Sequence, residues 1–183
     1  MSLAGSVAGG DRLRLFCALR LPDDVLDELG EWGRTHLVRG RVVARENLHV
    51  TLAFLGSRPS EDVEPVGEAL RAAAAAVGPI GFHADRYRET RSVGMVVLED
   101  ETGAAGELAR DLHERLRRLG VYEPEKRPWL AHVTVVRFRQ PVRLRPPVPP
   151  LRAFSPSDAA VYHSVLRSTG ARYEVLDSFA LGG

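Results

Sequence analysis

A repeated His-Val-Thr tripeptide constrains this chain more than any other feature of its sequence. The first copy lies in NLHVTLAFLG, from Asn47 to Gly56, and the second in LAHVTVVRF, from Leu130 to Phe138. Both copies sit among apolar and β-branched residues, a composition typical of β-strands. Successive side chains of a strand point to opposite faces, so each strand would carry a His and a Thr opposite an apolar stripe. In the first strand that stripe is expected to be Val50, Leu52 and Phe54.

The pairs His49 with Thr51 and His132 with Thr134 occupy equivalent positions in the two copies. Six His and six Thr in 183 residues give, by chance, about 0.2 His-x-Thr tripeptides. A single copy would be explained best as a histidine at the edge of a core strand, whereas two matched copies indicate a repeated functional device. If both strands border one cleft, they bring two imidazoles and two hydroxyls together.

The sequence resembles the two-histidine (2H) phosphoesterases, and most of all their RNA 2′,3′-cyclic phosphodiesterase branch, also called LigT-like or 2′-5′ RNA ligase-like. The resemblance covers roughly Leu13 to Leu181. RLFCALRLP resembles the opening strand of the family, and ENLHVTLAFLG resembles its first motif. Further matching residues are Arg127, Pro128, Arg137, Tyr162, Ser164, Gly170 and Tyr173. Ala131 departs from the pattern, because the family usually has Pro before the second His.

The resemblance implies an α+β fold with two lobes. In this fold two pseudo-symmetric antiparallel β-sheets face a central cleft, and the helices pack outside. It also implies substrates, namely RNA 3′ ends or nucleotides that carry a 2′,3′-cyclic phosphate. In such a reaction the resemblance implies that His49 protonates the leaving 3′ oxygen and His132 activates water, leaving a 2′-phosphate. The pseudo-symmetry of the two motifs leaves the reverse assignment open.

The hydrophobic pattern independently predicts two similar α+β halves, each with one His-Val-Thr strand. Helices are expected after the acidic starts that follow Pro22 and Pro59, and a third is expected from Gly103 to Leu119. The other expected strands span residues 13–21, 80–89, 93–99, 158–167 and 172–181. We therefore expect a strand and a helix to precede each histidine strand.

The paired residues suit the hydrolysis of a phosphodiester. Histidine can act as acid or base near neutrality, because its ordinary pKa is about 6.5. The hydroxyls of Thr51 and Thr134 are placed to donate hydrogen bonds to phosphate oxygens. Arg137 is a further substrate-binding candidate, although strand alternation puts it on the face away from His132 unless the strand ends or bulges there. Phe16 is expected either to stack on a nucleobase or to pack in the core.

Composition favours a single domain over residues 12–183, after a flexible leader over residues 1–11. The net charge of +1 provides no overall basic field, so an RNA substrate would be held by its end. Cys17 is the only cysteine, which excludes an internal disulfide and a cysteine-based metal site. We expect a cytoplasmic monomer without a metal or another cofactor.

Two alternatives use the same cleft. The protein could bind nucleotides or RNA ends with little or no turnover, although both motifs retain His and Thr. It could also join RNA ends as a 2′-5′ RNA ligase, although excess water favours hydrolysis. A metal-dependent hydrolase is disfavoured, since neither motif holds a second type of ligand at binding distance.

Overall fold

A computed structural model describes residues 11–182 of the chain. The predicted leader, apart from Asp11, lies outside these residues. The helices are α1 (Asp23–His36), α2 (Val63–Ala76) and α3 (Ala104–Arg118), with short 3₁₀ turns at Arg45–Asn47 and Ser60–Asp62. The strands are β1 (Arg12–Arg20), β2 (Arg41–Val42), β3 (His49–Pro59), β4 (Phe82–Glu89), β5 (Val93–Asp100), β6 (His132–Arg137), β7 (Asp158–Arg167) and β8 (Gly170–Phe179). All elements were expected from the sequence except the 3₁₀ turns and β2, which is too short to show a pattern.

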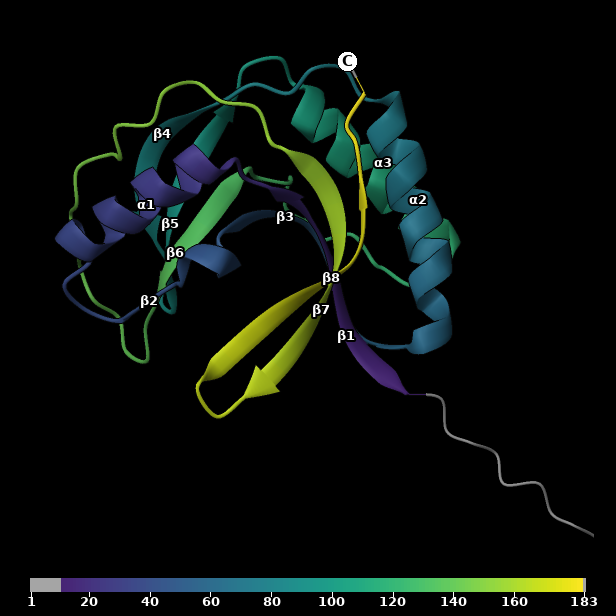
Figure 1. Cartoon of the computed structure of the whole chain (residues 1–183), viewed down its shortest axis with the longest axis horizontal. Helices are drawn as coiled ribbons and strands as arrows, with labels where there is room; N and C mark the ends of the chain where they lie inside the picture. The colour runs from purple at the N-terminus through teal and green to yellow at the C-terminus, as the bar shows by residue number, and fades with distance from the viewer. Residues whose placement is uncertain (1–10, 183) are drawn as a thin grey trace, which may run out of the picture.

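The strands form one strongly curved antiparallel sheet in the order β4-β5-β6-β3-β1-β7-β8, with β2 paired to the outer part of β6. One half contains β4, β5 and β6, and the other contains β3, β1, β7 and β8 (Figure 1). The two histidine strands join the halves through a single register pair, Val50 with Val133. The predicted α+β class is therefore confirmed, and its two lobes are the two halves of this curved sheet.

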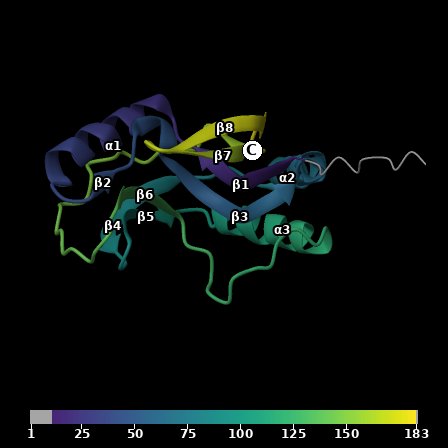
Figure 2. The same ribbon diagram turned by 90° about the horizontal axis from the view of Figure 1, so that it is seen from below.

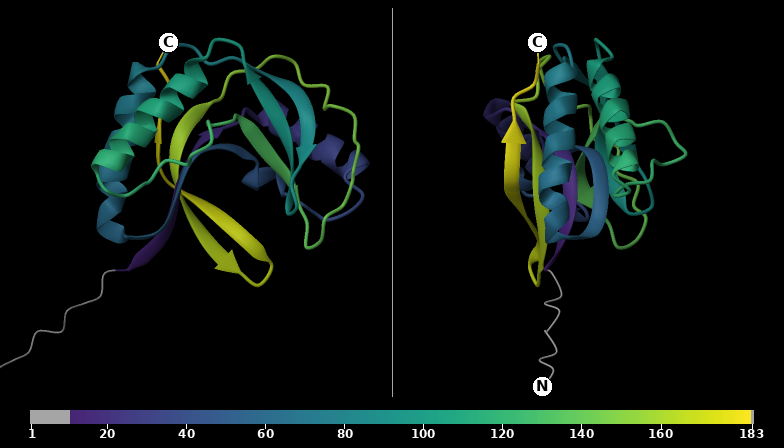
Figure 3. Two further views of the ribbon diagram at one scale, coloured as in Figure 1. Left: turned by 180° about the vertical axis from the view of Figure 1, so that it is seen from behind. Right: turned by 90° about the vertical axis from the view of Figure 1, so that its right-hand side faces the viewer.

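The helices lie outside the curve of the sheet. Helices α2 and α3 run side by side and pack against strands of both halves (Figure 3). Helix α1 lies near the other end of the molecule, as the view from below also shows (Figure 2). The sequence predicted a stripe of four leucines at helical spacing in α3. Leu108, Leu112 and Leu116 are fully buried, whereas Leu119, just past the end of the helix, is 46% exposed. No helix within residues 11–182 is long and apolar enough to cross a membrane.

Strand β1 is central in its half of the sheet and is covered on both faces. Leu15, Cys17 and Leu19 have no exposed surface, and Phe16 and Ala18 on the opposite face are also buried. Burial raises the pKa of the Cys17 thiol to about 12, because the thiolate would lose its hydration there. This thiol is therefore protonated at neutral pH and packs as a small apolar group.

Candidate active site

The two motif histidines lie on neighbouring strands and are held in the same way. The Nδ1 atom of His49 lies 2.7 Å from the carbonyl oxygen of Asn47, and that of His132 lies 2.8 Å from the carbonyl oxygen of Leu130. A carbonyl can only accept, so each Nδ1 carries the proton and donates it. In the neutral ring Nε2 is then the unprotonated nitrogen, free to take or, once protonated, to give a proton.

The motif threonines lie beside the imidazoles, as the strand alternation predicts. The hydroxyl of Thr51 lies 2.9 Å from Nε2 of His49 and can donate to it. Thr51, Thr134 and Arg137 line the same cavity as His49, with a volume of about 440 Å³. His132 lines an adjoining hollow of about 650 Å³, and Thr51 also borders that hollow. The structure thus brings the five predicted polar site residues to one continuous region.

Aromatic rings surround His49 on the side away from β6. The ring centroid of Phe16 lies 5.0 Å from that of His49, and the centroid of Tyr173 lies 5.4 Å from it. Phe16 is only 3% exposed and stacks on Tyr162 at 4.8 Å. Of the two roles expected for Phe16, this burial favours packing over stacking on a nucleobase, although the ring borders the cavity. Phe16 packs against the His49 imidazole.

This setting disfavours the positive form of His49. Burial is the largest cause and lowers the pKa of His49 to about 4. The positive charges of Arg137 and His132 act in the same direction, whereas the hydrogen bond to the Asn47 carbonyl opposes them. His49 is consequently neutral at pH 7 when no anion is bound beside it. An anion bound between these groups would raise its pKa again.

Each histidine strand contains a β-bulge directly after its threonine. The register of β3 against β1 skips Leu52, and the register of β6 against β5 skips Val135. An extra residue reverses the alternation of side chains beyond it. Phe54 and Arg137, each three residues after the threonine of its motif, therefore return to the cleft face and line the cavity.

The bulges correct one expectation and resolve another. Phe54 does not continue the apolar stripe of β3, because its side chain is 47% exposed and faces the cavity. Arg137 meets the condition under which it could reach the cleft, since the strand bulges before it. Gly94 lies opposite the bulge of β6, and a Cβ atom there would come within 2.6 Å of a methyl group of Val136.

Two residues that were not among the predicted site residues hold the bulge of β3 in place. The indole N–H of Trp129 donates to the carbonyl oxygen of Thr51 at 3.0 Å. Nε2 of His113, on α3, lies 2.7 Å from the carbonyl oxygen of Leu52 and donates to it. A bulge removes ladder partners from such carbonyls, so these side chains replace them. His113 is partly buried and has this carbonyl as its structural partner.

Metal ligands do not gather at this region. Within residues 11–182 there is no group of three or more His, Cys, Asp or Glu side chains arranged to hold a metal ion.

Comparison with known proteins relates the chain to one family. A family model described as LigT like Phosphoesterase matches residues 19–92. The chain is 29% identical to the RNA 2′,3′-cyclic phosphodiesterase of Escherichia coli (strain K12), and the match covers 92% of this chain and 96% of that protein. An RNA 2′,3′-cyclic phosphodiesterase of Geobacillus stearothermophilus is 30% identical over 77% of this chain, which spans 48% of that longer protein. The fold resembles the crystal structure of E. coli LigT complexed with 3′-AMP, with a TM-score of 0.80, 23% identity and coverage of 94% of this chain and 100% of that chain.

Trp129→Phe tests whether the held bulge matters for the site. This change removes the N–H that binds the Thr51 carbonyl and keeps an aromatic ring. We expect the free energy of unfolding to fall by about 1–2 kcal/mol, because a partly buried carbonyl loses its partner. We also expect kcat/KM for a nucleoside 2′,3′-cyclic phosphate to fall, because Thr51 is no longer held beside His49. Urea unfolding and initial rates measure the two effects.

Trp32→Phe is the matched control. The indole of Trp32 also donates to a carbonyl at 3.0 Å, that of Pro147, and it lies outside the cavity. The Trp32→Phe variant should lose a similar free energy of unfolding. It should keep its activity at a temperature where both variants are folded. Equal activity of the two variants would show that the bond to Thr51 has no catalytic effect.

Proposed function

We propose that the chain acts as the LigT-like phosphoesterases that it resembles, and that it hydrolyses RNA 2′,3′-cyclic phosphate ends to 2′-phosphomonoesters. The observation that carries this proposal is the matched pair of imidazoles on adjacent strands, each with its Nδ1 proton held by a carbonyl two residues earlier. Two such groups on either side of one phosphorus supply the acid and the base of the reaction. No metal is needed to generate the nucleophile in this scheme.

The proton transfers are balanced between the two histidines. His132 takes a proton from water, whose oxygen attacks phosphorus, and the bond from phosphorus to the 3′ oxygen breaks. His49 gives its proton to that oxygen, so the product carries a 3′ hydroxyl and a 2′-phosphate. Since the pKa of His49 is about 4 when no anion is bound beside it, His49 must gain its proton as the substrate binds. The negative charge of the cyclic phosphate favours that uptake.

The other cavity groups stabilise the charge that develops on phosphorus. Thr51 and Thr134 can donate hydrogen bonds to the non-bridging oxygens, where negative charge builds up in the transition state. Arg137 is placed by its bulge to contribute a guanidinium to the same phosphate. The exposed ring of Phe54 offers the nucleobase an apolar surface, a role for which buried Phe16 is unsuited.

A product assay tests this function directly. With a short RNA that ends in a 2′,3′-cyclic phosphate, the purified protein should release only the 2′-phosphomonoester, with EDTA present throughout. Chromatography against synthetic 2′- and 3′-phosphate standards identifies the product. An exclusive 3′-phosphate, or an activity that EDTA abolishes and a divalent cation restores, would contradict the proposal. Ligated RNA as the main product would show that the protein is a ligase.

Removing either imidazole should slow the reaction about 10²- to 10⁴-fold, the usual contribution of one general acid or base. The leaving group of bis(4-nitrophenyl) phosphate needs no proton, so His49→Ala should hydrolyse this substrate at a rate much closer to that of the wild type. The rate of His132→Ala should stay low with this substrate. The control is His83→Ala, because His83 also lies on a strand and pairs with Glu99 and Glu101 outside the cavity. Near-normal rates in both site variants would show that these histidines are not the catalytic pair.

The low pKa of His49 also sets the pH dependence. Since kcat/KM reports groups of the free enzyme, we expect a bell-shaped profile whose acid limb lies near pH 4 and not near 6.5. In His132→Ala only the His49 limb remains. Protonated His49 is the acid, so the residual activity should fall as pH rises above about 4. A residual activity that instead rises to a plateau would make His49 the base, and a wild-type rate that climbs steadily to pH 9 would exclude the pair.

A further inference from the structure

The cavity beside the motif strands is strongly basic. Its lining includes four arginines, Arg14, Arg41, Arg137 and Arg167, and no Asp or Glu. The whole chain, in contrast, has 25 basic and 24 acidic residues. At that composition a lining of this size would hold about two carboxylates. The lining is therefore richer in positive charge than the chain as a whole.

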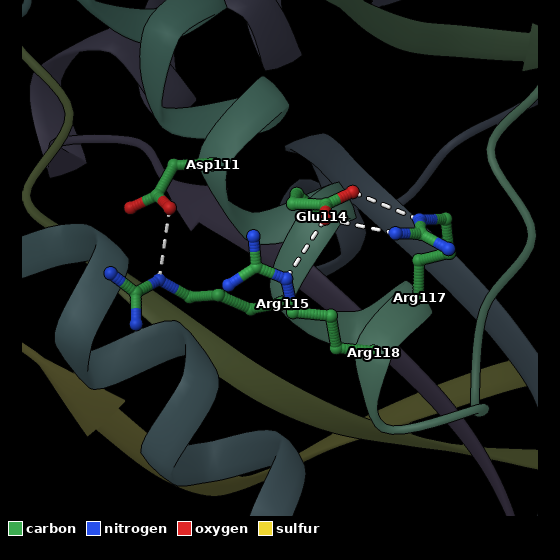
Figure 4. Close-up of polar contacts among 5 residues, drawn as sticks. All are labelled: Asp111, Glu114, Arg115, Arg117 and Arg118. Atoms are coloured by element: carbon green, nitrogen blue, oxygen red, sulfur yellow. Dashed lines mark hydrogen bonds and ion pairs between the residues drawn. The ribbon is translucent and has the colours of Figure 1, made fainter.

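Within the described residues, ten of the twenty arginines outside the cavity lie within 4 Å of a carboxylate. On α3, Arg115 contacts Asp111 at 3.0 Å, and Arg117 and Arg118 each contact Glu114 at 2.9 Å (Figure 4). Within residues 11–182, none of the four cavity arginines has a carboxylate within 4 Å. Their charge is thus available to an anion from outside the protein.

Two of these arginines come from the β6 side of the cavity. Arg41 and Arg137 are direct register partners on β2 and β6, and both side chains line the cavity. Like charges directly opposite one another destabilise a strand pair. A bound anion between the two guanidinium groups would offset that repulsion.

The other two come from the opposite half of the sheet. Arg14 on β1 lies over the exposed ring of Phe54, 4.8 Å from its centroid. Arg167 is the last residue of β7 and pairs with Gly170 across the hairpin turn. Arg41 reaches this turn from the far side, since a Cβ on Gly170 would lie 3.1 Å from its guanidinium. The arginines therefore surround the cavity from both halves.

We propose that Arg14, Arg41 and Arg167 bind the phosphodiester backbone upstream of the terminal cyclic phosphate, so that the protein binds an RNA strand more tightly than a mononucleotide. This inference rests on the proposed function, in which Arg137 serves the terminal phosphate. Guanidinium groups suit phosphates because they donate in a planar fork. A basic groove with an exposed aromatic ring is also the usual means of binding single-stranded nucleic acid.

Salt dependence measures the number of bound phosphates. For single strands, the logarithm of the association constant falls by about 0.7 per neutralised phosphate for each tenfold rise in salt. This slope can be measured for a labelled RNA pentamer with a 2′-phosphate end by fluorescence anisotropy, and for a nucleoside 2′-phosphate by competition. The slope for the pentamer should be steeper by about 2 than the slope for the nucleoside 2′-phosphate. Equal slopes for the two ligands would overturn the proposal.

Single substitutions assign the contacts. Arg14→Gln, Arg41→Gln and Arg167→Gln should each reduce the pentamer slope by about 0.7. Arg39→Gln is the matched control, because Arg39 is exposed, lies two residues before Arg41 and does not line the cavity. Thermal melting checks that each variant is folded. A slope that falls equally in Arg39→Gln would also refute the assignment.

The binding measurement needs no turnover, so the two proposals can fail separately. If the wild-type protein hydrolyses cyclic phosphate ends but binds pentamer and mononucleotide with one slope, only the backbone site is wrong. If the slopes differ as expected and no cyclic phosphate is hydrolysed, the backbone site stands and the proposed reaction is wrong.

Discussion

The contact between β3 and β6 is the constraint on which the rest of the structure depends. A single register pair, Val50 with Val133, joins the two halves of the sheet at the middle residues of the two His-Val-Thr tripeptides. Because the strands are antiparallel and share this pair, both imidazoles lie on one face. The halves curve apart beyond the pair, which leaves the cavity between them open to substrate.

The bulges next to this contact give the cleft its asymmetry. Each inserts one residue after a threonine and turns the residue three positions on toward the cleft. The same backbone device thus presents an arginine from β6 and a phenylalanine, Phe54, from β3. The distorted backbone of β3 is stabilised by donors from outside the sheet, Trp129 and His113, which bind its freed carbonyls. The geometry of the candidate site therefore depends on donors from outside the sheet as well as on the motif residues.

Burial and nearby positive charge act in the same direction on His49. Together they keep this imidazole neutral, with a pKa of about 4. The same positive charge attracts the anion whose arrival favours protonation of His49. The cavity arginines raise the attraction for phosphate without a basic field over the whole protein, because the net charge is only +1. Such a site suits the end of a strand more than a long duplex.

The sequence by itself determined the elements and the pairing of the two His-Val-Thr motifs, because these follow from local patterns. The repeated tripeptide indicated two matched strands, and the spacing of Leu108, Leu112 and Leu116 predicted α3. Only the tertiary structure decided the face of Phe54 and Arg137, the burial of Phe16 and the meeting of Arg41 with the Gly170 turn. These depend on register, bulges and contacts between residues far apart in the chain, and a period of two along one strand contains none of that information.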